Sequence, residues 1–160
     1  MSFFLIAGCI GKEEVTIAQD PHIAQDYEYL KKVSDLVLIG EIEEKLDYAT
    51  VNDYRGQVYR VRVSDYLVVD NDNREFVDII LLKENKAGDR FVDHKLQIEA
   101  NVGENVILFL SEFGDYYSGA AMPWYGIVDD QEIVEVRVPE KLDSLAKEFE
   151  GVSVKELLLE

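Results

Sequence analysis

The sequence predicts one mainly β domain of the α+β class, a small barrel or sandwich with helices at both ends. Its length of 160 residues suits a single domain. Six or seven short apolar or alternating segments lie between residues 36 and 138, and turn-forming residues separate them. Apolar residues take helical spacing before and after this series. A run of strands framed by helices is typical of this fold class.

A helix is expected over residues 21–33. Asp20 can accept a backbone N–H bond at its start, and Pro21 suits the first helical position because proline has no N–H to leave unpaired. Apolar residues then repeat at i, i+4 and i+7 from Ile23, which is the spacing of one helical face.

Two strands are expected at residues 36–42 and 58–69. The first is aliphatic at its start and then alternates with glutamate, as a strand with one solvent-facing side does. The second has the strongest alternation in the chain. Its two faces divide the side chains as follows: Tyr59, Val61 and Val63 lie on one face, and Arg60 and Arg62 lie on the other.

The rest of the chain is expected to alternate strands and turns. Residues 106–110 contain no polar side chain, so this strand should be buried centrally. Further strands are expected at residues 76–82, 91–99, 116–128 with a break at Pro123, and 133–138 before Pro139, with turns or loops at 70–73, 83–90, 103–105 and 129–130. Helical spacing returns at residues 142–149, Gly151 ends that helix, and Ser153 with Glu156 forms a capping box for a last short helix.

The charge of the chain limits its partners. The sequence has 33 acidic and 16 basic residues, a formal net charge of −17, so its field repels phosphate backbones and anionic membrane surfaces. We therefore expect no nucleic-acid partner. The single cysteine can form neither an intramolecular disulfide nor a cysteine-based zinc site.

The first residues differ in composition from the rest. Residues 1–11 carry no charged side chain, and their apolar run is about half the roughly 20 residues that a membrane-spanning helix needs. The segment Leu5-Ile6-Ala7-Gly8-Cys9 resembles the lipobox of prokaryotic lipoproteins, although no basic residue precedes it. This resemblance implies a signal-like segment over residues 1–9, a diacylglyceryl group on Cys9, and a tether over residues 10–19. The domain proper would then span residues 20–160, lipid-anchored at the extracytoplasmic face of the cell membrane.

A second interpretation of the N-terminal segment stays open. Residues 3–10 can be interpreted as a buried first strand, with Cys9 as a small core thiol. The protein would then be a soluble cytoplasmic domain whose acidic surface binds a basic protein.

The succession of strands carries a second resemblance. Residues 35–42, 59–63 and 103–110 follow one another in an order that resembles netrin-like and metalloproteinase-inhibitor-like domains, which are OB-type barrels. The resemblance spans about residues 35–128 and implies an OB-like antiparallel barrel. Extracellular members of that family depend on disulfides and on an N-terminal cysteine that binds the target's metal. With one cysteine in the chain, the resemblance therefore concerns the fold.

No motif of a known catalytic or cofactor site occurs in the sequence. It has no phosphate-binding glycine loop, nucleophile elbow, His-Glu-x-x-His helix or CxxC pair. His22 and His94 lie far apart in sequence, and exposed or capping positions are the default for such histidines. Residues 70–75 begin like a calcium loop, but the loop lacks its glycine and has Leu81 in place of its last glutamate, which indicates an acidic turn. We expect no enzyme, no cofactor and no metal.

Aromatic residues form the candidate binding surface. They are Tyr116, Tyr117, Trp124 and Tyr125. Tyrosine and tryptophan combine a large apolar area with a polar group and are favoured at interfaces, but aromatic residues on strands also commonly lie in the core. The sequence thus predicts a membrane-tethered, non-enzymatic binding or structural domain with an unidentified ligand or protein partner.

Overall fold

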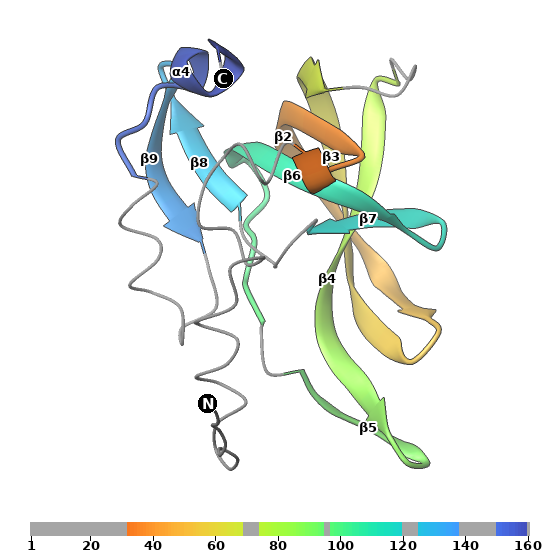
Figure 1. Ribbon diagram of the computed structural model, residues 1–160. Coiled ribbons are helices and arrows are strands. Elements are labelled where there is room, and N and C mark those ends of the chain that lie inside the picture. The colour runs from red at the N-terminus through yellow and green to blue at the C-terminus, as the bar shows by residue number, and fades with distance from the viewer. Residues whose placement is uncertain (1–31, 69–73, 95–96, 120–124, 138–149, 160) are drawn as a thin grey trace, which may run out of the picture.

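The protein folds around one 8-stranded sheet (Figure 1). The computed structural model describes residues 32–68, 74–94, 97–119, 125–137 and 150–159. Its elements are β2 (Leu36–Val51), β3 (Tyr54–Val68), β4 (Phe76–Ala87), β5 (Arg90–Asp93), β6 (Asn105–Phe113), β7 (Tyr116–Gly119), β8 (Tyr125–Asp129), β9 (Glu132–Arg137) and α4 (Val154–Leu159). The prediction of a mainly β fold is confirmed.

Strand pairing in this sheet returns to the strand at which it starts. β2 pairs with β3, β3 with β4, β4 with β7, β7 with β6, and β6 pairs with β2 again. These pairings are antiparallel, except that β4 and β7 run parallel. We call these five strands the closed circuit. β5 extends the sheet from β4, whereas β8 pairs with β6 and β9 with β8 (Figure 1).

The core lies on one face of the circuit strands. Its cluster of buried side chains includes alternate residues of each long strand, as period-2 geometry requires: Leu36, Leu38 and Ile42 of β2, Tyr59 and Val61 of β3, Val77, Ile79 and Leu81 of β4, and Val106, Leu108 and Leu110 of β6. Val63 packs against this cluster, and Arg60 and Arg62 lie on the opposite face of β3, as predicted. Residues 106–110 are all buried, which confirms their expected central position.

Several strands depart from the predicted lengths, and β3 begins at Tyr54, four residues before its expected start. β2 continues past Ile42 to Val51. The sequence pattern did not predict this part, because bulges between Ile42 and Glu44 and between Lys45 and Tyr48 break the alternation by which a strand is recognised. β4 continues through most of the loop expected at 83–90 and turns only at Gly88, whose φ is 67°. The strand expected at 91–99 ends at Asp93, and residues 97–99 belong to no strand.

Several turns and ends agree with the sequence. Asp130 and Gln131 both have positive φ in the tight turn between β8 and β9. Gly151 also has positive φ, and Ser153 Oγ accepts a hydrogen bond from the backbone N–H of Lys155 at the start of α4.

Other sequence predictions lie outside the described residues. They concern residues 1–19, the helix at 21–33 except for its helical last two residues, the turn at 70–73, Pro123, Pro139 and residues 142–149. Within the part of the chain that the structure describes, no helix has the length and apolar character needed to span a membrane.

Candidate functional site

The core face becomes polar where the long strands extend beyond the rest of the sheet. On β4, the buried positions Ile79 and Leu81 are followed on the same face by Lys83. On β3, Tyr59 is followed, two residues toward the turn, by Gln57. Because a strand alternates its side chains strictly, both polar residues continue the row of core side chains.

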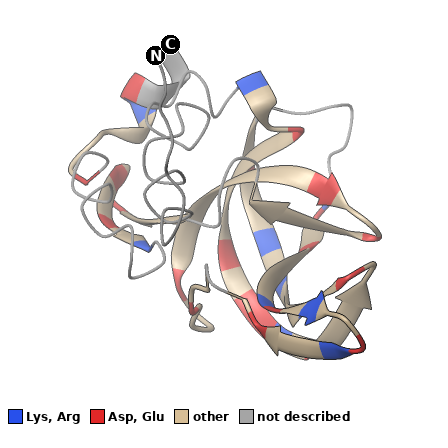
Figure 2. Ribbon diagram, turned by 60° about the horizontal axis from the view of Figure 1, so that its bottom comes forward, with Lys and Arg blue, Asp and Glu red and all other residues tan. Residues whose placement is uncertain are grey.

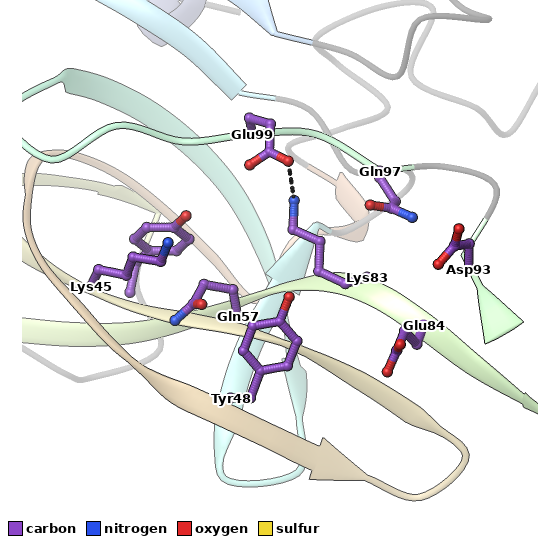
Figure 3. A pocket seen from close by; sticks show the side chains of 9 residues that line it. Lys45, Tyr48, Gln57, Lys83, Glu84, Asp93, Gln97 and Glu99 are labelled. Carbon is purple, nitrogen blue, oxygen red and sulfur yellow. Dashed lines mark hydrogen bonds and ion pairs between the residues drawn. The ribbon is translucent and has the colours of Figure 1, made fainter. Parts of the chain in front are cut away.

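A cavity of about 340 Å³ lies at this polar end. β2, β3, β4, β5 and residues 97–99 all contribute to its lining, and Figure 3 shows Lys83 in the middle with Lys45 and Asp93 on opposite sides of it. Tyr48 and Gln57 face the same space (Figure 3). We call this space the polar cavity.

Lys83 is the buried charge of the polar cavity. The residue is only 8% exposed, and its Nζ donates to Ile98 O and to Glu99 Oε1, each at 2.9 Å. A buried ammonium is tolerated only when it is paired and hydrogen-bonded, and these two contacts meet that need. An ammonium has three donors, so one N–H of Lys83 remains for a ligand or water.

Gln57 is the buried amide of the polar cavity. It is 5% exposed, and its Nε2 donates to the carbonyls of Leu46 and Val58. Leu46 lies in the bulged part of β2, where the ladder leaves a carbonyl for a side chain to satisfy. Gln57 Oε1 accepts no hydrogen bond from any described residue, so it offers an acceptor at the cavity.

Residues 97–101 form one wall of the polar cavity, and we call them the strap. The strap forms no strand-to-strand hydrogen bonds of a sheet, yet side chains from three strands donate hydrogen bonds to three of its backbone carbonyls. Lys83 binds Ile98 O, Tyr125 Oη donates to Glu99 O at 2.7 Å, and Tyr59 Oη donates to Ala100 O at 3.4 Å. Burial is the main cause that raises the pKa of both tyrosines, and nearby glutamates add to it, so both remain neutral donors.

A partly buried ion pair lies beside the strap. Glu104 lies beside Tyr125, with 3.1 Å from Tyr125 Oη to Glu104 Oε1. Arg137 Nη2 donates to Glu104 Oε2 at 2.8 Å. Hydrogen bonding to Glu135 is the largest cause that raises the pKa of Arg137, which holds its positive charge in place.

The aromatic residues singled out from the sequence do not form one surface. Tyr125 is 1% exposed and belongs to the core cluster, so its expected place on a binding surface is corrected: its ring is needed for packing and its hydroxyl for the strap. Tyr116 and Tyr117 of β7 are half-buried. Tyr117 packs against the core cluster, and its hydroxyl accepts a bond from Arg74. Trp124 and Cys9 lie outside the described residues.

His94 follows β5 and lies outside the lining of the polar cavity. Its ring contacts Tyr54 edge to face at 6.0 Å between centroids, and burial lowers its pKa. This histidine is therefore neutral at pH 7 and in a packing position. His22 and the acidic turn at 70–73 are not described, and the described residues contain no group of three side chains that could hold a metal ion.

Sequence reasoning missed the polar cavity because its residues come from segments interpreted separately. Lys83 was expected in a loop, and Lys45 and Tyr48 lie in the part of β2 that no pattern indicated. A signal did exist, since Lys83 follows Val77, Ile79 and Leu81 at strict two-residue spacing.

The lining of the polar cavity is suited to binding. Its described residues supply amides, phenols, ammonium groups and carboxylates, all of which can form hydrogen bonds with a ligand. Comparison with models of known protein families, with curated proteins and with solved structures finds no match to this chain. The chain's own residues therefore carry the functional argument.

Proposed function

We propose that this protein is a membrane-tethered, non-enzymatic binding domain, held by lipid on Cys9 and built on an OB-type barrel. The observation that carries the proposal is the closed circuit. Residues 36–119 supply all five of its strands, so the circuit needs no strand from residues 1–9. That leaves the lipobox-like segment free to act as a signal and Cys9 as the attachment site.

The strand order supports the OB-type part of the proposal. An OB-fold is a five-stranded, partly open Greek-key barrel, and the closed circuit likewise joins five strands with β2 at both ends of the pairing order. The core cluster would then fill the barrel interior, and the polar cavity would lie at one end of it. β8, β9 and α4 would be additions outside the barrel.

The alternative is a soluble cytoplasmic domain in which residues 3–10 form a buried strand. The first part of β2 leaves little room for it, since residues 36–41 already pair with β6 on one edge while most of them pair with β3 on the other. The acidic composition that suggests a basic protein partner is common to both interpretations.

The test is detergent-phase partition of the full chain expressed in a bacterium that processes lipoproteins. We expect the wild-type protein in the detergent phase, with a mature N-terminus whose mass corresponds to lipid-modified Cys9. Cys9→Ser should move the protein to the aqueous phase, because two acyl chains are about what stable anchoring requires.

A matched control keeps one cysteine but moves it. The double variant Ser2→Cys with Cys9→Ser has the wild-type cysteine content outside the lipobox-like spacing. It should behave like Cys9→Ser. Equal partition of wild type and both variants would rule out the anchor.

A further inference from the structure

We propose that the polar cavity binds a neutral sugar of one or two rings. The cavity lies at the end of a core face, where two buried polar side chains, Lys83 and Gln57, replace apolar ones. Burying a polar side chain in a core costs free energy unless it is hydrogen-bonded. After the contacts of Lys83 to the strap and of Gln57 to Leu46, one N–H donor of Lys83 and the Oε1 acceptor of Gln57 remain unused. Both residues line the cavity, so these groups are available to a ligand there.

The charges of the lining exclude simple ions. Two lysines and three carboxylates surround the space: Lys45, Lys83, Glu84, Asp93 and Glu99. Glu99 is paired with Lys83 and Glu84 with Arg55, so an anion would meet Asp93, unpaired among the described residues, inside a protein of net charge −17, and a cation would meet the likewise unpaired Lys45. A neutral ligand avoids both costs.

The hydrogen-bonding pattern favours hydroxyl groups. Lys45 and Lys83 can only donate, and ionised Asp93 and Glu99 can only accept. A hydroxyl group both donates and accepts, so a polyol can satisfy both kinds of side chain at once. Lys45 and Asp93 have no ion-pair partner among the described residues, and they lie on opposite sides of Lys83 in Figure 3.

Tyr48 is the exposed aromatic side chain at the polar cavity, whose lining is otherwise mainly polar. Its side chain is 54% exposed, although it lines the cavity, and Figure 3 shows its hydroxyl directed toward Lys83. An exposed aromatic ring next to hydrogen-bonding groups suits a sugar, whose ring has an apolar C–H face and a polar edge. A volume of about 340 Å³ is at the lower end of small-molecule sites, which fits one or two rings.

The cavity is also held in shape without a ligand. The strap is attached to β4 through Lys83, to β8 through Tyr125 and to β3 through Tyr59. Binding therefore orders little of the protein, which lowers the entropic cost of association.

The experiment is a titration of the full chain, kept in a detergent without a sugar headgroup, with glucose, galactose, mannose, N-acetylglucosamine, maltose and lactose. Inorganic phosphate and glycylglycine serve as the anionic and zwitterionic probes. Saturation-transfer NMR detects binding, and calorimetry measures Kd. We expect at least one sugar to bind with Kd of about 1 mM or lower, and neither ionic probe to bind.

Variants locate the site. Tyr48→Ala should weaken sugar binding about tenfold, and Asp93→Asn should weaken it by a similar factor. Val134→Ala is the matched control for Tyr48, since Val134 is equally exposed on β9, away from the cavity. Asp115→Asn, in the turn after β6, is the control for Asp93. Both controls should bind as the wild type does.

Three results would overturn the proposal. These are the absence of binding by every sugar in the panel, sugar binding that Tyr48→Ala and Asp93→Asn leave unchanged, and binding of phosphate or glycylglycine alone. The inference names the ligand for the binding role proposed above, but its test does not involve Cys9. Loss of the anchor and loss of sugar binding are therefore measured separately.

Discussion

Two glycines determine how closely β3 approaches its neighbours. A Cβ atom on Gly56 would overlap the backbone oxygen of Leu81 and lie 2.9 Å from Ile80 Cγ1. A Cβ atom on Gly40 would lie 2.5 Å from Arg62 O. The need for glycine here comes from contacts across strands, in the first case with the backbone of β4 and in the second with that of β3.

Gly56→Ala should therefore be more harmful than an ordinary glycine substitution. We expect a loss of about 3 kcal/mol in the free energy of unfolding, because the backbones of β3 and β4 must separate to admit the methyl group. Gly88→Ala is the control: its added Cβ would meet no atom within 4 Å, and only its φ of 67° opposes the change. Gly88→Ala should cost about 1 kcal/mol. Urea unfolding of both variants tests this, and equal losses would contradict the close approach at Gly56.

Single residues also show where local sequence patterns mislead. Lys83 belongs to a polar stretch, and a lysine is almost never fully buried unless it is paired. Its partners are Ile98 and Glu99, 15 and 16 residues away, and nothing in the sequence around Lys83 indicates them. Lys83 was expected in a loop, and neither its position on the core face nor the contacts that make its burial possible were predicted.

Among the elements, the strap depends most on side chains. It leaves the sheet after β5 and reaches β6 without a ladder, so its carbonyls rely on Lys83, Tyr59 and Tyr125. A strand was expected at residues 91–99, and Ile98 and Ala100 are indeed both buried, as alternate residues of a strand would be. Burial of alternate residues is thus not proof of a strand when side chains can satisfy the backbone.

Tyr125→Phe should loosen the strap. The change keeps the buried ring but removes the 2.7 Å bond to Glu99 O, which then keeps only the longer contact of 3.5 Å from Arg137 Nη1, and loss of such a bond costs about 1 kcal/mol. Amide exchange in residues 97–101 should become faster. Tyr48→Phe is the control, because its hydroxyl has no partner among the described residues, and its effect should stay within about 0.5 kcal/mol. Unchanged exchange in Tyr125→Phe would show that the hydroxyl does not hold the strap.

β2 shows how an unpaired strand edge can be protected. From Glu43 to Val51 the strand pairs with β3 on one edge, and the described residues place no strand on its other edge. Bulges and charged side chains occur along this part, and both discourage pairing with another chain. These same bulges removed the alternation that would have predicted the full strand.

Across the whole molecule, the acidic charge is partly neutralised on the sheet. Figure 2 shows acidic and basic residues interspersed along the strands. Arg60 pairs with Asp78 at 2.9 Å, Arg55 Nε lies 3.1 Å from Glu84 Oε1, and Arg62 pairs with Glu43. These pairs are at least partly exposed, so each adds little stability. Together they neutralise acidic side chains beside β3, which reduces the electrostatic repulsion among the protein's acidic residues.

Removing residues 2–10 tests the organisation of the whole chain. The closed circuit is complete without them, so we expect the free energy of unfolding to change by less than about 0.5 kcal/mol. A buried strand would instead contribute several kcal/mol, and a loss of that size would favour the soluble cytoplasmic interpretation. Comparison with Cys9→Ser, which changes one atom of the same segment, separates the loss of the segment from the loss of lipid.

The sequence by itself determined the mainly β class, the central position of residues 106–110, the two faces of β3, and the turns at Asp130 and Gly151. Each of these depends on alternation or on local backbone preference, which neighbouring residues specify. Only the tertiary structure decided that β6 returns to β2, that Tyr125 lies inside, and that Lys45, Gln57, Lys83 and Asp93 surround one cavity. These features depend on which distant strands pair and in which register, and a local pattern does not contain that information.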